Sequence, residues 1–287
     1  MAQTPLPPPP GFRRVAKRLI GKKVRYVYPF ADSERGKEAA ATHAAYLHEA
    51  KERYRFSKFR ELRKTNTMLD LSLVYPIFRW RDPLEQVFEH VLRCNRYFMK
   101  LDIKDAFGSV FPGVHREFTR PVIHIDGEAL EWTGWPFFHP GQDGLIQGAP
   151  ASPLIFEQYC AVTGFDRMLR EYARKHQLVV TRYVDDIVFS SATPFGRRAF
   201  PTMRRRFASY GFTLNEAKSG LFDTKRKPLE FLGVSLLQGR VVPRPAFFEQ
   251  LTTLGVGPNY GHYAWMARVE QLNEAIQLIK KRSAQSA

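Results

Sequence analysis

Two adjacent carboxylates, Asp185 and Asp186, interrupt a stretch of sequence that otherwise favours β-strand. Residues 178–183 precede them and residues 187–189 follow. Both runs are rich in β-branched and aromatic side chains, a pattern that predicts a hairpin. A tight hairpin turn usually contains Asn-Gly or Asp-Gly, because its backbone needs a positive φ. Asp-Asp lacks the glycine and places two like charges side by side, which indicates a positive group between them. A divalent metal is the leading candidate, since Mg²⁺ prefers oxygen ligands, and a solvated polar turn is the alternative.

The chain carries a large excess of positive charge. Its 287 residues include 44 Lys or Arg against 28 Asp or Glu, which gives a net charge of +16. Such an excess favours a polyanionic partner, and nucleic acid is the first expectation. A merely basic soluble surface is the alternative. Residues 1–64 hold 16 of the basic residues but only six acids, so most of the imbalance lies in the first quarter of the chain.

The remaining composition points to an ordinary globular protein without a membrane partner. The two cysteines, Cys94 and Cys160, give neither a disulfide framework nor metal-ligand spacing, and we interpret each as a small core residue. The cysteine usage predicts a reducing, cytoplasmic location. No apolar run is long enough to span a bilayer or to form the core of a signal peptide. Residues 5–10, rich in proline, predict an extended tail.

Hydrophobic periodicity predicts both helices and strands along the chain. Asp82 is the expected N-cap of a helix that begins at Pro83, because proline suits the first helical position. The other expected helices cover residues 34–56, one long segment from Ser152 to about Tyr172, residues 197–210 and residues 262–281. The expected strands cover residues 97–103, two short runs around Asp126-Gly127, the 178–190 hairpin, and residues 229–237 and 240–243. Because hairpins are frequent, the sequence predicts an α+β fold with an antiparallel sheet.

Asp102 is a third candidate carboxylate, because it ends the apolar strand that begins at Tyr97. If folding brings it to Asp185 and Asp186, the three carboxylates form a site for two Mg²⁺ ions. Such a pair clamps the attacking and leaving oxygens of a phosphoryl transfer. Asp102 lies 83 positions before Asp185, so only the fold can bring them together. A capping or turn residue is the alternative for Asp102 alone.

Five segments, in the right order, resemble the motifs of reverse transcriptases of the Tyr-x-Asp-Asp type. They are Leu-Asp-Ile-Lys-Asp-Ala-Phe at 101–107, Leu-Ile-Gln-Gly-Ala-Pro-Ala-Ser-Pro at 145–153, Tyr-Val-Asp-Asp at 183–186, Gly-Phe-Thr-Leu-Asn at 211–215 followed by Lys218, and Phe-Leu-Gly at 231–233. Each motif alone is weak, but five in order are specific. The resemblance covers about residues 97–235 and implies a right-hand polymerase architecture with fingers, palm and a short helical thumb.

The resemblance implies a set of metal ligands and an acid. Asp102, Asp185 and Asp186, with the backbone carbonyl of Ile103, would hold two Mg²⁺ ions, with Mn²⁺ as the alternative metal. Lys218 would protonate the leaving pyrophosphate, and a solvated surface lysine is the alternative for it.

The resemblance also implies contacts to the incoming nucleotide. Phe107 would take the steric-gate position and reject the 2′-hydroxyl of a ribonucleotide by clash, although a core phenylalanine is the commoner fate of such a residue. An ordinary Gly-Pro loop is the alternative for the segment around Gln147. The full set of predicted nucleotide-binding residues is Ile103, Asp105, Ala106, Phe107, Gln147, Gly148 and Tyr183.

Two groups of basic residues are candidates for contacts to phosphate. A triphosphate-binding residue of the fingers is expected among Arg60, Arg63, Lys64, Arg79 and Arg81, without a choice among them. The helix with Arg204, Arg205 and Arg206 could track a nucleic-acid backbone, or present a solvated face.

The sequence therefore predicts an RNA-directed DNA polymerase that extends a primer 3′-hydroxyl with dNTPs. The segment after residue 240 has room for a short thumb but not for an RNase H, endonuclease or splicing domain, so the chain resembles bacterial retron and antiphage-defence enzymes. We expect a Pro-rich tail at 1–11, a basic region with fingers at 12–96, the palm with part of the fingers at 97–238 and the thumb at 239–287.

The expected partners are an RNA template, most simply a structured non-coding RNA, and the DNA product. A protein partner or a second copy could complete the grip on the duplex. Two alternatives stay open: a nucleic-acid-binding scaffold on a polymerase fold, and untemplated DNA synthesis by the same site.

Overall fold

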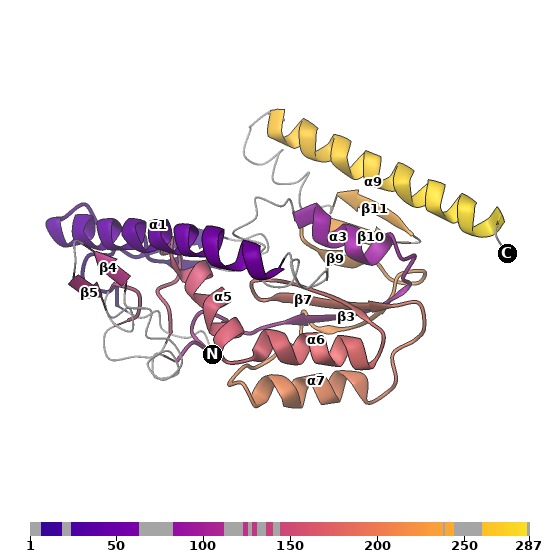
Figure 1. Ribbon diagram of the computed structural model, residues 1–287, viewed down its shortest axis with the longest axis horizontal. Coiled ribbons are helices and arrows are strands. Elements are labelled where there is room, and N and C mark those ends of the chain that lie inside the picture. Colours follow the sequence, from indigo (N-terminus) through magenta and orange to yellow (C-terminus); the bar gives the residue numbers. More distant parts are fainter. Residues whose placement is uncertain are drawn as a thin grey trace. The chain divides into compact units, whose positions relative to one another are not determined.

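The computed structural model describes residues 7–18, 24–62, 83–111, 123–125, 128–130, 136–139, 144–237, 239–243 and 260–285 (Figure 1). The chain divides into two compact units, which are described separately. The first unit comprises residues 1–78, 105–167 and 210–212, and the second comprises residues 79–104, 168–209 and 213–287. The chain thus passes between the units several times. The four regions expected from the sequence stay a prediction.

A four-stranded antiparallel sheet forms the centre of the second unit. Its strands are β3 (Tyr97–Asp102), β6 (Val179–Tyr183), β7 (Asp186–Ser191) and β8 (Gly220–Asp223), in the order β6-β7-β3-β8. Strands β6 and β7 form the predicted hairpin, with Tyr183 opposite Asp186. The β-branched and aromatic side chains of this hairpin are largely buried, as expected of a central sheet.

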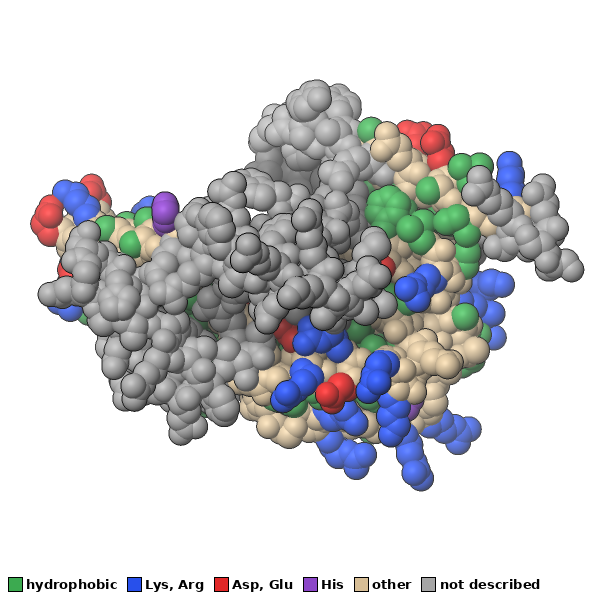
Figure 2. Space-filling model, in the orientation of Figure 1, with side chains coloured by type: hydrophobic (Ala, Val, Ile, Leu, Met, Phe, Trp, Pro, Cys, Tyr) green, Lys and Arg blue, Asp and Glu red, His purple; other side chains and the backbone are tan. Residues whose placement is uncertain are grey.

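The two faces of this sheet have different coverings. Side chains of directly opposite residues share a face, and successive residues alternate between faces. One face carries Asp102, Asp186 and Val188, and part of it is buried by a hydrophobic cluster that includes α3 (Pro83–Val91). The other face carries Phe189, whose ring meets Tyr172 of α6 (Phe165–Lys175) at 5.6 Å between centroids. Helix α7 (Ala199–Ala208) lies beside α6, and Lys and Arg side chains gather over these helices (Figure 2).

The described part of the second unit also contains a smaller sheet and the last helix. Strands β9 (Leu229–Phe231), β10 (Val234–Leu237) and β11 (Arg240–Pro243) are antiparallel, in the order β11-β10-β9. Helix α9 (Tyr260–Gln285) packs Val269, Leu272 and Ile276 into the core. Its Asn273 accepts a hydrogen bond from the Val241 N–H at 2.9 Å and donates one to the Val241 carbonyl at 2.6 Å. The side-chain amide thus pairs with edge strand β11 as another strand would.

The first unit contains one long helix and two short hairpins. Strands β1 (Val15–Arg18) and β2 (Val24–Val27) pair with each other, as do β4 (Ile123–Ile125) and β5 (Glu128–Leu130). Helices α1 (Glu34–Leu62) and α5 (Ser152–Val162) are the other long elements among the described residues of this unit. The buried His43 of α1 contacts the Pro136 carbonyl at 3.0 Å and accepts a hydrogen bond from the Ala151 N–H at 3.3 Å, so it ties α1 to the segment that precedes α5.

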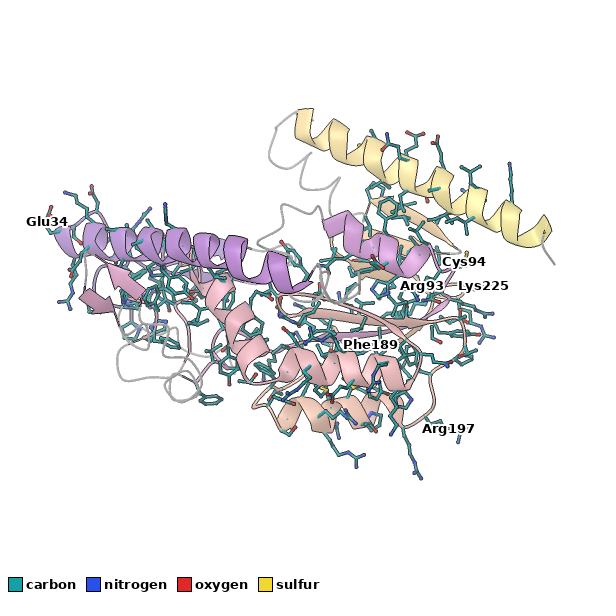
Figure 3. All side chains as sticks on the ribbon, in the orientation of Figure 1. Glu34, Arg93, Cys94, Phe189, Arg197 and Lys225 are labelled. Carbon is teal, nitrogen blue, oxygen red and sulfur yellow. The ribbon has the colours of Figure 1, made fainter. Side chains whose placement is uncertain are left out.

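The mixed α+β fold with antiparallel sheets is confirmed, but three local predictions are wrong. The long helix expected from Ser152 is two helices, because Gly164 adopts φ +81° and breaks it between α5 and α6. The strand expected over 229–237 is a hairpin, because Leu232 and Gly233 both have positive φ. Cys94 is exposed in the turn after α3 rather than buried (Figure 3), while Cys160 is buried as predicted.

Other sequence expectations fall partly or wholly outside the described residues. Helix α3 begins at Pro83 as predicted, but its expected cap, Asp82, is outside the described ranges, as is the Asp126-Gly127 turn. The strands β1, β2 and β8 were not expected from the sequence. Within the described residues, no helix combines the length and the apolar character required to cross a membrane.

Candidate active site

The three predicted carboxylates come from two neighbouring strands of the central sheet. The antiparallel register places Asp102, the last residue of β3, opposite Asp186, the first residue of β7. The backbone N–H of Ile103 donates a hydrogen bond to the carbonyl of Asp185 at 3.1 Å. Asp102 is buried and the other two carboxylates are half-buried. The fold therefore brings together at one end of the sheet three acids that lie far apart in the sequence.

Two lysine ammonium groups lie against these carboxylates. The Nζ of Lys218, the predicted acid, is 3.2 Å from Asp102 Oδ2. The Nζ of Lys100 is 3.1 Å from Asp186 Oδ1 and also donates a hydrogen bond to the Glu230 carbonyl of β9 at 2.8 Å. Lys100 was missed by the sequence reasoning. Its position two residues before Asp102 on a strand could have revealed it, because residues i and i+2 share a face.

Burial sets the electrostatics of the Asp-Asp turn. It raises the pKa of Asp185, and the neighbouring charges of Asp186 and Asp102 raise it further, while Lys218 opposes them. Burial also raises the pKa of Asp186, against the lowering effect of Lys100. The site therefore favours nearby positive charge, which stabilises the ionised forms of Asp185 and Asp186.

The donor chemistry of the site fits a divalent cation. Asp186 Oδ1 is buried and accepts no hydrogen bond of acceptable geometry, although the Lys100 ammonium is within ion-pair distance. Carboxylate oxygens are the ligands that Mg²⁺ and Mn²⁺ prefer. Across the described ranges, no group of three or more His, Cys, Asp or Glu side chains is arranged as a ready metal site. Instead, the carboxylates Asp102 and Asp186 each have an ammonium partner here.

The turn that carries the carboxylates has a strained backbone and a buried support. Val184 has φ +55°, a region that β-branched residues rarely adopt. The guanidinium of Arg182, which is fully buried, donates a hydrogen bond to the Val184 carbonyl at 2.9 Å. Gln86 of α3 donates a hydrogen bond to the Arg182 carbonyl at 3.4 Å. Sequence reasoning missed this support, because an arginine within a strand gives no signal that it points inward.

A second polar cluster lies on the same face of the sheet as Asp186. His90 of α3 is fully buried, with its Nδ1 2.7 Å from the Ser190 hydroxyl and its Nε2 2.8 Å from the Thr181 hydroxyl. Asn95 donates a further hydrogen bond to Ser190 at 2.7 Å. Burial lowers the pKa of His90 to about 3, so its ring is neutral at pH 7. This cluster fixes α3 onto strands β6 and β7.

Most of the predicted nucleotide-binding residues belong to the first unit. The Phe107 carbonyl accepts a hydrogen bond from the Leu145 N–H at 2.8 Å, which joins the first motif to the Gln-Gly segment. The Gln147 carbonyl accepts one from the Tyr28 N–H at 2.8 Å. The half-buried Phe107 ring meets Phe156 edge-on at 5.9 Å. The structure thus places the predicted Phe107 and Gln147 segments side by side within this unit.

The other predicted residues have distinct surroundings. Asp105 is exposed with φ +50°, and Ala106 beside it is buried. Gly148 has φ +91°, and a Cβ there would lie 2.9 Å from the Val27 Cβ, so the loop needs glycine. Tyr183 belongs to the second unit, directly opposite Asp186.

Of the basic residues predicted to contact phosphate, the structure describes the side chains of only some. Arg204 of α7 forms an ion pair with Glu216 at 3.1 Å, and the Arg206 guanidinium lies over the Tyr172 ring. The side chains of the predicted fingers candidates are outside the described part of the chain; these are Arg60, Arg63, Lys64, Arg79 and Arg81.

Comparison with known proteins decides the family. Residues 45–236 match the family described as reverse transcriptase (RNA-dependent DNA polymerase), and this match covers well over half of the chain. The chain belongs to the reverse transcriptase family. The retron Mx65 reverse transcriptase of Myxococcus xanthus is 29% identical over 141 residues, which cover 44% of this chain and 33% of that protein.

A solved reverse transcriptase-like structure has the same fold. The telomerase of Candida tropicalis in complex with a TWJ fragment of telomeric RNA aligns with a TM-score of 0.51 and 12% identity, over 96% of this chain and 53% of that one. The chain thus spans about a third of the curated relative and about half of the solved structure. The predicted reverse transcriptase family is confirmed, and with it that family's enzyme class, RNA-directed DNA polymerase, and the polymerase fold. The retron type stays a prediction, which the similarity to the Myxococcus xanthus protein supports. Enzymes of this family use divalent metal ions.

Proposed function

We propose that this reverse transcriptase extends a primer 3′-hydroxyl with dNTPs on an RNA template, using Asp102, Asp185 and Asp186 as its catalytic carboxylates. The observation that carries the proposal is the register of β3 and β7, which sets Asp102 opposite Asp186 in a chain of this family. The main-chain bond from Ile103 to Asp185 supports it, because it fixes the Asp-Asp turn to the end of β3.

The chain's own residues have defined roles in this proposal. Two divalent ions, most simply Mg²⁺, would supply charge neutralisation at the attacking hydroxyl and at the leaving pyrophosphate when bound by the three carboxylates and the Ile103 carbonyl. Lys218, which now pairs with Asp102, would give its proton to the departing pyrophosphate oxygen. Lys100 links Asp186 to strand β9, because its ammonium contacts the Asp186 carboxylate and the Glu230 carbonyl.

The proposed selection of deoxyribonucleotides depends on Phe107, with Asp105, Ala106, Gln147, Gly148 and Tyr183 as further nucleotide contacts. The half-buried Phe107 ring is braced edge-on by Phe156, which makes a rigid wall. We expect Phe107→Ala to admit ribonucleotides, because the truncated side chain no longer clashes with a 2′-hydroxyl. Primer extension with rNTPs in place of dNTPs measures this, and unchanged discrimination would remove Phe107 from the site.

The template in this proposal is a dedicated structured non-coding RNA, and the biological setting is bacterial antiphage defence. The similarity to the retron Mx65 reverse transcriptase supports both. The net charge of +16 supports a nucleic-acid partner of considerable size. A protein partner or a second copy of the chain would complete the grip on the duplex.

A primer-extension assay tests the polymerase proposal. The purified chain receives Mg²⁺, labelled dNTPs and a DNA primer annealed to an RNA of defined sequence. We expect template-directed products that disappear in Asp185→Asn and persist in Asp223→Asn, a matched exchange on the neighbouring strand β8. Products whose sequence ignores the template would establish untemplated synthesis. No product with any RNA, including the RNA that co-purifies, would favour the scaffold function.

A further inference from the structure

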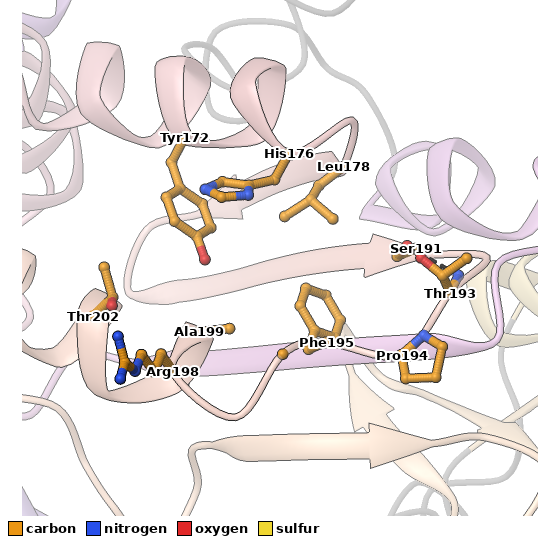
Figure 4. Close-up of a pocket in the computed structure, with 11 residues that line it drawn as sticks. Tyr172, His176, Leu178, Ser191, Thr193, Pro194, Phe195, Arg198, Ala199 and Thr202 are labelled. Carbon is orange, nitrogen blue, oxygen red and sulfur yellow. Dashed lines mark hydrogen bonds between the residues drawn. The ribbon is translucent and has the colours of Figure 1, made fainter.

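The side of the central sheet away from the carboxylates carries two adjoining pockets. The first, about 300 Å³, lies between α6, the end of β7 and the loop that leads into α7 (Figure 4). Its lining includes Tyr172, His176, Phe195 and Arg198. The second, about 400 Å³, is lined by Glu171, Tyr172, Arg174, Lys175 and Arg206. The two pockets share Tyr172 and together form one grooved surface, here called the α6–α7 surface.

The α6–α7 surface is strongly basic. Residues 165–175 and 197–208 contain nine Lys or Arg and two acids, Asp166 and Glu171, of which Asp166 is buried. Among the described residues, no carboxylate forms an ion pair with Arg174, Lys175 or Arg198, whereas Arg204 at the other end of α7 is paired with Glu216. The cations are Arg167, Arg170, Arg174, Lys175, Arg197, Arg198, Arg204, Arg205 and Arg206. The cations that line the pockets therefore have their charge available to a ligand.

Favourable interaction with the helix dipoles explains only some of the cations on the α6–α7 surface. Arg174 and Lys175 lie in the last turn of α6, where cations interact favourably with the helix dipole. Arg197 and Arg198 precede the first turn of α7, where the same dipole disfavours them, and Arg198 makes no side-chain capping hydrogen bond. The helix dipole therefore accounts for the cations at the end of α6 but not for the arginines before α7.

The pockets combine aromatic rings with these cations. Tyr172 is buried, with the exposed His176 ring 4.5 Å from it, and the half-buried Phe195 lines the first pocket from the loop before α7. His176 and Phe195 are therefore the rings that a base could reach. The Arg206 guanidinium is 5.3 Å from the Tyr172 ring centroid in the second pocket. Aromatic rings that stack bases, next to Lys and Arg that contact phosphates, are typical of sites for single-stranded nucleic acid. An acidic peptide would use the cations but not the rings.

We propose that the α6–α7 surface is a second nucleic-acid site, which binds a single-stranded segment with a base in the first pocket and backbone phosphates along Arg198, Arg174 and Lys175. It is separate from the carboxylates, because Tyr172 packs on Phe189, whose side chain is on the face opposite Asp186. The site goes beyond the polymerase function, because it would hold the RNA strand, or its DNA product, outside the catalytic centre.

Binding measurements on charge-matched variants test this site. The test variant is Arg174→Gln/Lys175→Gln/Arg198→Gln, and the control is Arg93→Gln/Lys225→Gln/Arg240→Gln, which removes three exposed cations elsewhere in the unit. Both are made on an Asp185→Asn background, so that no result depends on catalysis. With a labelled oligouridylate of about 12 nucleotides, we expect the test variant to weaken binding tenfold or more and to reduce the salt slope by about 2, since each lost contact removes about 0.7. We expect the control to bind within about threefold of the parent. Equal binding and equal slopes in the two variants would overturn the site.

Three further arms identify the ligand and its position. Phe195→Ala, made in the chain that keeps Asp185, should weaken oligouridylate binding about fivefold or more, through lost stacking, while primer extension on a preformed hybrid stays at the level of the unsubstituted chain. Crosslinks from 4-thiouridine RNA should map to residues 172–176 and 192–202, and crosslinks confined to other segments would refute the assignment. Oligothymidylate in place of oligouridylate distinguishes DNA from RNA as the bound strand. If polyglutamate competes as well as either oligonucleotide, the surface is a protein-binding site instead.

Discussion

One face of the central sheet carries two clusters of polar groups, one around His90 and one around Asp186. They differ in whether their hydrogen bonds are complete. Around His90, each ring nitrogen meets a hydroxyl and Ser190 has a second donor. Around Asp186, a buried carboxylate oxygen accepts no hydrogen bond, and burial raises the pKa of two neighbouring aspartates. A polar group whose hydrogen bonds are complete stabilises the fold, whereas one left incomplete retains capacity for a ligand. The face therefore separates a structural cluster from a candidate catalytic one.

Exchange at the carboxylate end should abolish activity and spare the fold. We expect Asp186→Asn to lower primer extension about a thousandfold or more, since it removes a charge that acts on the reacting phosphate. Its melting temperature should match or exceed that of the parent chain, because the ionised carboxylate is disfavoured by burial. Thermal unfolding beside the activity assay measures both. A variant that loses activity by unfolding would show that this carboxylate is also structural.

Substitution of His90 should lower the stability of the fold and spare the activity. His90→Ala should lower the free energy of unfolding by about 3 kcal/mol, because it leaves a cavity, removes the hydrogen-bond partner of the buried Thr181 hydroxyl and leaves Ser190 with Asn95 alone. His48→Ala, at an exposed position on α1, should change it by less than about 0.5 kcal/mol. Urea unfolding measures both variants. Activity per folded molecule should persist in His90→Ala, and a specific loss of turnover would link this cluster to catalysis.

Lowering the pH should destabilise the fold through His90. The pKa of His90 is about 3 in the folded chain, below its ordinary value of 6.5. Between these values the unfolded chain binds a proton that the folded chain does not, so stability falls as pH falls below 6.5. The loss amounts to about 2 kcal/mol at pH 5. Unfolding of the parent and of His90→Asn at several pH values isolates this contribution, and parallel curves would contradict it.

The strained turn should give the smallest effect. Val184→Gly relieves a positive φ that costs about 1–2 kcal/mol, against a glycine entropy cost of about 0.5–1 kcal/mol, so we expect a gain in stability of no more than about 1.5 kcal/mol. Val180→Gly, in the buried strand β6 that leads into this turn, should be clearly destabilising. Chemical denaturation ranks the two. A large loss in Val184→Gly would show that the valine side chain matters more than its backbone.

The elements that could be predicted were those with strong local signals. The hairpin at 178–190 followed from β-branched runs on both sides of a polar break, and the start of α3 from Pro83. The family followed from the order of five motifs. The register that sets Asp102 opposite Asp186 is a long-range pairing, and no local pattern specifies it.

The features that escaped prediction depend on tertiary surroundings. Gly164 looked tolerable within a helix until its positive φ ended α5. Arg182 gave no sign of burial, because its role depends on a carbonyl that a strained turn presents to it. Strand β8 has an exposed Leu221 and no alternating pattern, so its pairing with β3 rather than its composition makes it a strand.

The amide of Asn273 has a mechanical consequence for the last helix. The Asn273 side chain bonds both the N–H and the C=O of one residue, Val241. These two bonds fix the position of α9 along strand β11 of the small sheet. A slide of α9 by one turn would break both bonds at once and displace three core side chains. Any movement of α9 relative to the small sheet that keeps both bonds must therefore be a tilt about Asn273, not a translation along the helix axis.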